Sequence, residues 1–242
     1  RRVELIGVRH CRHPDGPLEF ADCPLLINHA LRICPSVRPM SDDWAVNSTH
    51  LDPWLLSAPV LVVSATQSEA AYVPAHLPVL ITGIGKTAAA IAVAERLATW
   101  AAQGRDLTEL LLLNVGTAGA LHDHYEGLHE VGAVRNHDMN AEVVRSLGYD
   151  PEEHIEWGEG VHLASGDTFV ADPEVRDQLA TWADLVDMEG YAIALAAQHF
   201  GCSLRMIKHV SDQADEGAMD WPTLVDLSAR ALGEWLALEC AD

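Results

Sequence analysis

Four acidic residues lie at the ends of apolar runs, where they could carry chemistry. Glu69 follows a β-branched run, Asp212 closes another, and Asp187 and Glu189 flank one methionine in an otherwise apolar stretch. An ionised carboxylate away from water is costly unless a partner compensates it. Such a group can accept hydrogen bonds from a diol or, when protonated, give a proton to a leaving group. The pattern therefore predicts acids that line a cleft.

The elements that position these acids are short apolar runs alternating with helical segments. β-Branched runs that end in small residues indicate buried strands, and Ala-rich or amphipathic stretches indicate helices. This alternation predicts an α/β fold, with a mostly parallel or mixed central sheet flanked by helices in three layers. The expected strands are 59–65, 77–83, 109–116, 161–166, 183–187 and 203–212. The expected helices are 86–103, one capped by Asp172 and opened by Pro173, one beginning near Glu189, and 222–238, whose predicted apolar stripe is Leu224, Leu227, Ala231, Trp235 and Leu238.

The strand ends are where chemistry is expected, because ligands of such sheets bind beyond the carboxyl ends of the strands. Glu69, Glu189 and Asp212 would converge there with one aromatic residue, Phe169. Basic residues are nearly absent from these ends. An acid-lined cleft with one aromatic ring suits a neutral, polyhydroxylated ligand with a planar base, such as a nucleoside.

The composition is that of a globular protein. The chain has 242 residues, of which 49% are hydrophobic and 21% charged, with a formal net charge of −21. This charge argues against nucleic acid or an anionic membrane as a partner, because phosphates repel such a field. No apolar run reaches the roughly 18 residues of a membrane span. Five cysteines without a CxxC pair indicate reduced thiols, and hence a cytoplasmic location.

Residues 1–56 differ from the rest, since they hold three of the five cysteines and scattered apolar residues. We expect an irregular N-terminal extension there and a single catalytic domain over residues 57–242. Residues 1–39 precede Met40 and are expected to lie upstream of the natural start. An intact mass of the native protein would test that expectation.

Five segments in order resemble one known family. "GIGKTAAA", "NVGTAGAL", "HLASGDTFV", "VDMEGYAIA" and "KHVSDQAD" are similar to motifs of the nucleoside phosphorylase and nucleosidase superfamily. The chain looks most like its 5′-methylthioadenosine/S-adenosylhomocysteine nucleosidase branch, over roughly residues 58–238. Each motif falls at a predicted strand end, which makes the set more specific than any one of them.

The resemblance implies a role for each matched residue. Glu69 matches the acid that activates water, and Asp212 the acid that protonates purine N7. Glu189 matches the glutamate that binds the ribose hydroxyls. The other matched residues would bind substrate: Ser211 places Asp212, Met188 packs beneath the sugar, Phe169 stacks on the base, Val170 contacts the base edge through its backbone, and Thr117, Ala118 and Gly119 form the floor. No cofactor or metal is implied.

Water rather than phosphate is the expected nucleophile. A phosphorylase needs a cation for the dianion, and Arg is the residue best suited to grip it. The resemblance places that arginine at the position of Asn114, and the loop after the first strand carries Glu69 without an arginine. Lys86 is the one cation that favours phosphate. A phosphate-dependent phosphorylase, a futalosine-type hydrolase and a non-catalytic nucleoside-binding module therefore remain as alternatives.

The 5′ side of the substrate is less well defined by the motifs. The stretches 66–78 and 121–164 are shorter than the family pattern, although His137 and Asp138 match its histidine–aspartate segment. Methylthioadenosine, S-adenosylhomocysteine, 5′-deoxyadenosine and a futalosine-like nucleoside all stay open as substrates. The resemblance also implies a homodimer.

Three further patterns favour structural interpretations. "GIGKT" lacks the earlier glycine of a phosphate-binding P-loop, so a tight turn before a helix is expected. His122, His124 and His129 are bunched, but the stretch has no strand or helix period, so an exposed loop is favoured over a metal site. Asp187 is expected to orient neighbouring groups rather than to act in catalysis.

Overall fold

The computed structural model describes residues 59–215, 218–219 and 221–240. The predicted extension at residues 1–56 lies outside the described residues, so the division at residue 57 stays a prediction. The strands are β1 (Val60–Ser64), β2 (Val79–Ile81), β3 (Leu111–Ala120), β4 (Leu128–Asn136), β5 (His154–Glu156), β6 (Val161–Ser165), β7 (Leu185–Asp187) and β8 (Ser203–Asp212). The helices are α2 (Lys86–Ala102), α3 (Ala141–Ser146), α4 (Pro173–Leu179), α5 (Gly190–Phe200) and α6 (Trp221–Glu239).

All eight described strands join one mixed sheet, in the order β2-β1-β3-β7-β6-β4-β5, with β8 paired to both β3 and β4. The pairs β1–β2, β1–β3, β3–β8, β4–β6 and β6–β7 are parallel, and β3–β7, β4–β5 and β4–β8 are antiparallel. Because β8 bridges β3 and β4, five strands close a ring, β3-β7-β6-β4-β8. The ring brings the ends of β3, β7 and β8 together, as the site requires. The predicted mixed α/β class is confirmed.

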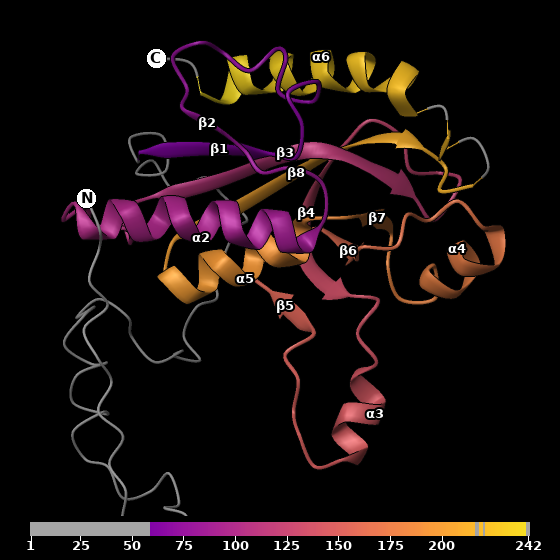
Figure 1. The fold of residues 1–242 in the computed structure, drawn as a ribbon. Coiled ribbons are helices and arrows are strands. Elements are labelled where there is room, and N and C mark those ends of the chain that lie inside the picture. The colour runs from indigo at the N-terminus through magenta and orange to yellow at the C-terminus, as the bar shows by residue number, and fades with distance from the viewer. Residues whose placement is uncertain (1–58, 216–217, 220, 241–242) are drawn as a thin grey trace, which may run out of the picture. The chain divides into compact units, whose positions relative to one another are not determined.

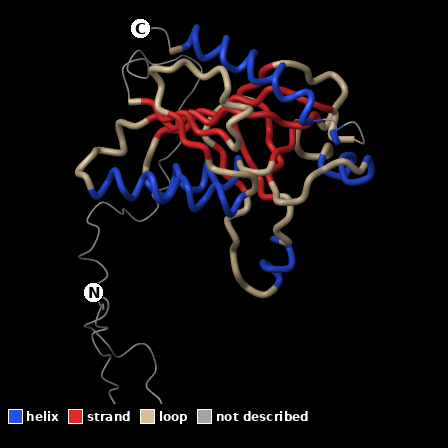
Figure 2. The backbone as a smooth tube through the Cα atoms, turned by 45° about the horizontal axis from the view of Figure 1, so that its top comes forward, coloured by secondary structure: helices blue, strands red, loops and turns tan. Residues whose placement is uncertain are grey.

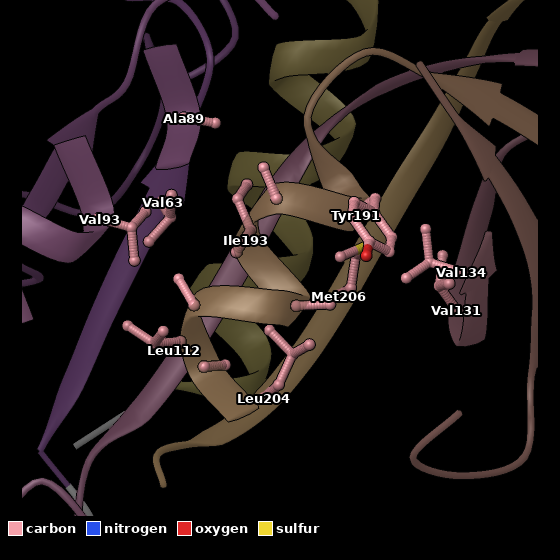
Figure 3. Packing of buried hydrophobic residues seen from close by; sticks show 14 of the residues in the cluster. Val63, Ala89, Val93, Leu112, Val131, Val134, Tyr191, Ile193, Leu204 and Met206 are labelled. Atoms are coloured by element: carbon pink, nitrogen blue, oxygen red, sulfur yellow. The ribbon is translucent and has the colours of Figure 1, made fainter. Parts of the chain in front are cut away.

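Helices cover both faces of the sheet. Helices α2 and α5 pack side by side on one face, and α6 lies across the other (Figures 1 and 2). Adjacent residues of the central strands therefore both face apolar layers: Val63 and Leu112 pack toward α2 and α5, while Val62 and Leu113 pack toward α6. Figure 3 shows the first of these layers. Burial on both faces explains why these strands are continuously apolar. Within the described residues, no helix combines the length and apolarity needed to cross a membrane.

Local signals position the helices as the sequence predicts. The Asp172 side chain accepts a hydrogen bond from the backbone N–H of Glu174 at 2.8 Å, and Pro173 begins α4. Helix α5 begins directly after Glu189 and ends at Gly201, whose φ of 70° is the left-handed conformation that favours glycine. The turn between β7 and α5 therefore carries Glu189 on a rigid strand-to-helix junction.

Two predictions about elements are wrong. The apolar stripe expected on α6 fails at Leu227 and Leu238, which are 67% and 80% exposed. The buried face of α6 instead carries Val225, Ser228, Ala229, Leu232, Gly233 and Leu236. Glycine occupies position 233 of this face because the helix approaches the backbone of Tyr72 closely; a Cβ on Gly233 would lie 2.5 Å from the Tyr72 carbonyl oxygen.

The second error lies between residues 121 and 156. Strands β4 and β5 and helix α3 were not predicted there. Helix α3 lies on an excursion between β4 and β5 that projects from the sheet (Figure 1). Strand β4 pairs with β5, β6 and β8, and its consecutive residues 131–134 are all buried, so its sequence shows no simple alternation.

Candidate active site

One cavity of about 340 Å³ lies at the ends of β1, β3, β6, β7 and β8. All ten residues predicted to form the site line it: Glu69, Thr117, Ala118, Gly119, Phe169, Val170, Met188, Glu189, Ser211 and Asp212. They come from segments that are distant in sequence, so the fold brings them together. The lining also includes Ala65, Thr66, Ile84, Thr168, Val186, Asp187 and Trp221, and within the described part of the chain it holds no lysine or arginine.

Glu69 is held rigidly in the turn that follows β1. It is 5% exposed, and each carboxylate oxygen accepts two hydrogen bonds. One oxygen accepts from the backbone N–H and hydroxyl of Thr66, both at 3.0 Å, and the other from those of Thr117, both at 2.9 Å. The two backbone donors fix the carboxylate in place. The two hydroxyls can rotate and so can yield an acceptor position to a water molecule.

Trp221 extends this network and was not predicted from the sequence. Its indole N–H donates to the Thr117 hydroxyl at 2.9 Å, and that hydroxyl in turn donates to Glu69. Because an indole N–H can only donate, it leaves the Thr117 hydroxyl free to act as donor toward the acid. Trp221 is the first residue of α6, far from β3 in sequence, and no local pattern signals this contact.

Glu189 is buried and is held by the turn that precedes α2. Its Oε1 accepts from the backbone N–H of Gly85 at 2.8 Å, and Gly85 has a φ of 94° that favours glycine. Burial, together with the nearby charge of Asp187, raises the pKa of Glu189 to about 7. The "GIGKT" segment thus binds a carboxylate of the protein itself, in agreement with the tight turn predicted there.

Lys86, the one cation that favoured a phosphate site in the sequence, is engaged elsewhere. Its ammonium group forms an ion pair with Asp138 and donates to the Asn136 side chain at 2.6 Å. Its backbone N–H donates to Asp167 at 2.7 Å. Lys86 does not line the cavity. Asp138, matched to the family's histidine–aspartate segment, therefore anchors the start of α2.

Asp187 pairs with a buried lysine behind the cavity. The Nζ of Lys208 lies 2.7 Å from Oδ2 of Asp187, and only 2% of the lysine side chain is exposed. The backbone N–H of Gly190 also donates to both Asp187 oxygens, at 3.1 and 2.9 Å. Burial lowers the pKa of Lys208, but the charges of Asp187 and Glu189 outweigh it and raise that pKa above its usual value. The ammonium group is therefore charged.

The Lys208→Met variant is expected to lose about 3–5 kcal/mol of unfolding free energy at neutral pH, because Asp187 would stay buried without its cation. Urea unfolding measures this loss. The double variant Asp187→Asn/Lys208→Met removes both charges and should recover most of it. Equal losses in the single and double variants would contradict this account of the pair.

Asp212 faces Glu69 and Glu189 from the end of β8. Its Oδ2 accepts from the Ser211 hydroxyl at 2.6 Å, and its Oδ1 accepts from the backbone N–H of Ala214 at 2.9 Å. The register between β3 and β8 shifts between Ala118 and Gly119, so that Gly119 lies opposite Asp212. Ser211 thus contacts Asp212 directly, as its predicted role requires.

Two glycines of β3 leave room for the acids. A Cβ on Gly119 would lie 2.9 Å from Oδ1 of Asp212, and a Cβ on Gly116 would lie 3.1 Å from Oε1 of Glu69 and 3.6 Å from Nζ of Lys208. Both positions are therefore places where side chains from other elements approach the strand backbone.

The apolar part of the cavity comes from β6 and β7 and the segments that follow them. Phe169 is 47% exposed, so its ring is available to a ligand and is not a core residue. Val170 is buried, and Met188 is partly buried between Asp187 and Glu189. These side chains can provide a face for a planar base and an apolar floor for a sugar.

The histidine cluster lies outside this cavity. His122 contacts the Ala183 carbonyl oxygen at 3.2 Å, and His129 contacts that of Glu126 at 3.0 Å. Residues 121–127 form the predicted loop, but the loop prediction is wrong for His129 and Glu130, which lie in β4. Among the described residues, no group of three or more His, Cys, Asp or Glu side chains is arranged to hold a metal ion.

Residues 136–232 match the model of the family described as the Phosphorylase superfamily. The match confirms the predicted resemblance to this superfamily. The matched residues include β6, β7 and β8 and the acids Glu189 and Asp212, but not Glu69.

Among curated proteins, an aminodeoxyfutalosine nucleosidase of Helicobacter pylori is 38% identical over 88 residues. The aligned stretch spans 35% of this chain and 38% of that protein. The chain thus matches well under half the length of the curated relative.

Solved structures are similar over a longer range. A 5′-methylthioadenosine/S-adenosylhomocysteine nucleosidase of Helicobacter pylori has a TM-score of 0.61 at 22% identity, covering 74% of this chain and 96% of that one. The corresponding enzyme of Neisseria meningitidis has a TM-score of 0.62 at 20% identity, covering 74% and 97%. At this identity, the likeness shows that the chain shares the fold of these proteins.

Proposed function

We propose that the protein hydrolyses the N-ribosidic bond of a purine nucleoside, releasing the free base and the sugar. The observation that carries the proposal is one cavity lined by Glu69, Glu189 and Asp212, with an exposed Phe169 and no lysine or arginine among its described lining residues. Breaking this bond creates positive charge on the sugar, which an acid-lined site stabilises. The names of the similar proteins, which are nucleosidases, support the same reaction class.

In the proposed mechanism each acid has one role. Asp212, in its protonated form, gives its proton to N7 of the purine, and the Ser211 hydroxyl fixes its orientation. Glu189 accepts hydrogen bonds from the two ribose hydroxyls, and its charge favours the developing cation. Glu69 takes a proton from the attacking water on the other face of the sugar. This division of labour parallels an inverting glycosidase with its acid and base on opposite sides.

Hydrolysis is favoured over phosphorolysis because nothing in the described part of the cavity suits a dianion. Asn114, at the position where the resemblance places an arginine, donates its side-chain N–H to the Val63 carbonyl oxygen at 3.0 Å and is buried. Lys86 is bound to Asp138, and Glu69 would repel phosphate. These residues therefore offer phosphate no charged donor.

The proposed substrates are 5′-methylthioadenosine and S-adenosylhomocysteine, with an aminodeoxyfutalosine-type nucleoside as the second candidate. The second is favoured by the curated relative from Helicobacter pylori, whose name states that substrate. A homodimer and a cytoplasmic location are parts of the same proposal. The bond that is broken is the same for all these substrates.

Incubating the protein with each nucleoside, with and without phosphate, tests the reaction. We expect free purine and free sugar at equal rates in both buffers. Sugar 1-phosphate formed only in phosphate buffer would show a phosphorylase. Binding without purine release from any of the nucleosides would show a non-catalytic module.

A further inference from the structure

Lys208 is the feature of the site that the proposed mechanism does not use. Its ammonium group is buried behind the cavity wall, where it pairs with Asp187 and also interacts with the charges of Glu189 and Glu69. A fully buried lysine is rare unless paired. Here one cation lies among three carboxylates, and it cannot reach a ligand directly because it does not line the cavity.

The fold makes room for this arrangement at Gly116. A Cβ at this position would meet Glu69 Oε1 and Lys208 Nζ together, so the acid and the cation approach each other across the bare backbone of β3. Asp187 holds the other side of the ammonium group at 2.7 Å. Lys208 therefore has a fixed place between Glu69, which would activate water, and Asp187, which lies two residues before Glu189 at the same strand-to-helix junction.

We propose that Lys208 is a positioning residue whose charge, fixed by Asp187, keeps Glu189 in the carboxylate form that accepts the ribose hydroxyls. The inference rests on the proposed function, since it names the group that keeps one of its acids charged. The two members of the ion pair then act on Glu189 in opposite directions: Lys208 favours its charged form, and Asp187 disfavours it.

The groups that act on the charge of Glu189 come from four segments, β7, β8, the turn after β1 and the start of α2. Asp187 on β7 and Glu69 after β1 disfavour its charge, as does burial, and Asp212 lies across the same cavity. Lys208 on β8 and the Gly85 N–H at the start of α2 favour its charge. Lys86, the next residue of α2, is neutralised by Asp138. Lys208 is thus the cation that balances two neighbouring carboxylates.

The sign of the pH effect follows directly. With a pKa of about 7, Glu189 gains a proton as the pH falls through neutrality and then loses acceptor positions for the diol. The rate constant kcat/KM should therefore fall as the pH is lowered below about 7, and we call this part of the pH profile the acid limb. Removing Asp187's charge should move this acid limb to lower pH, and removing Lys208's charge should move it to higher pH.

The test compares Asp187→Asn with Asp187→Asn/Lys208→Met, so that no variant leaves Asp187 buried without a cation. In the single variant, the amide oxygen of the introduced asparagine can still accept the hydrogen bond from Lys208, and the charges of Glu189 and Glu69 still favour the charged ammonium group. We expect the acid limb of Asp187→Asn to lie about one to three pH units below that of the parent. The acid limb of the double variant should lie above that of Asp187→Asn by a similar amount. Lys208→Arg on the parent background should keep the parental limb, because it keeps the charge.

A merely structural ion pair gives a different result. Both variants break the ion pair, so if the pair were merely structural, both would have the same acid limb whatever their change in stability. That outcome would overturn the inference. The variant Asp177→Asn, an exposed change on α4, controls for the substitution itself.

A second measurement needs no turnover. In protein labelled with ¹³C at the Glu carboxyl carbons, the resonance missing from Glu189→Gln identifies Glu189, and its titration is followed in the same variants. The same downward and upward displacements are expected. If the parent releases no purine yet these displacements occur, the proposed function fails and the electrostatic role of Lys208 stands. If the titration does not move, the inference fails whether or not purine is released.

Discussion

The Asp212→Asn variant should release purine about 10²–10⁴-fold more slowly than the parent, because an amide cannot deliver the proton that N7 needs. Asparagine retains an oxygen that can accept from the Ala214 N–H, so the local structure at the end of β8 should persist. Nucleoside binding should change little, since Asp212 is assigned to the leaving group in the transition state rather than to the bound substrate. Single-turnover purine release and calorimetric binding measure the two quantities.

The matched control is again Asp177→Asn, which makes the same chemical change outside the cavity and should keep the parental rate. A variant of Asp212 that retained more than about a tenth of the parental kcat would exclude it as the general acid, given the usual size of such effects. Loss of binding in parallel with the rate would instead make Asp212 a residue that binds the ground state.

The Glu69→Gln variant is expected to lose a similar factor of about 10²–10⁴ in kcat, because glutamine cannot take a proton from water. Its amide nitrogen must also face one of two backbone donors, Thr66 or Thr117, so the side chain cannot keep all the hydrogen bonds of the acid. The rate of purine release measures the effect. Glu95→Gln, an exposed change on α2, is the control.

Azide separates a missing base from a disturbed site. Azide attacks without giving up a proton. In Glu69→Gln, the negative charge that would repel the azide anion is also gone. Added azide should therefore restore purine release in Glu69→Gln and yield a sugar azide, but should not restore it in Asp212→Asn, whose leaving group stays unprotonated. The absence of rescue in Glu69→Gln, with the fold intact by circular dichroism, would argue against Glu69 as the base.

The convergence of Glu69, Glu189 and Asp212 could be predicted because each lies at or shortly after the end of an apolar strand, and strand ends in such a sheet share one region. The same rule explains the correct placement of Phe169 and Ser211. What decides these positions is local: a β-branched run, a small residue, then a polar one. Strands with both faces buried are easily recognised in this way.

Other features depend on contacts that no local pattern records. The hydrogen bond from Trp221 to Thr117 joins α6 to β3, and the pair of Asp187 with Lys208 joins β7 to β8. The buried face of α6 is the one on which Gly233 fits against Tyr72 and Leu232 and Leu236 are buried, so a stripe that includes Leu227 was misleading. These errors arise where close packing, rather than periodic apolarity, sets the contact.

The two glycines of β3 have a wider consequence for how such a site can vary. Glu69 follows β1, and Lys208 and Asp212 lie on β8, but the space that these three side chains occupy is set by β3 at Gly116 and Gly119. Besides the two donors of Thr117, that strand contributes to the site through the side chains that its two glycines lack. A larger residue at either glycine would therefore displace an acid or its cation from the site.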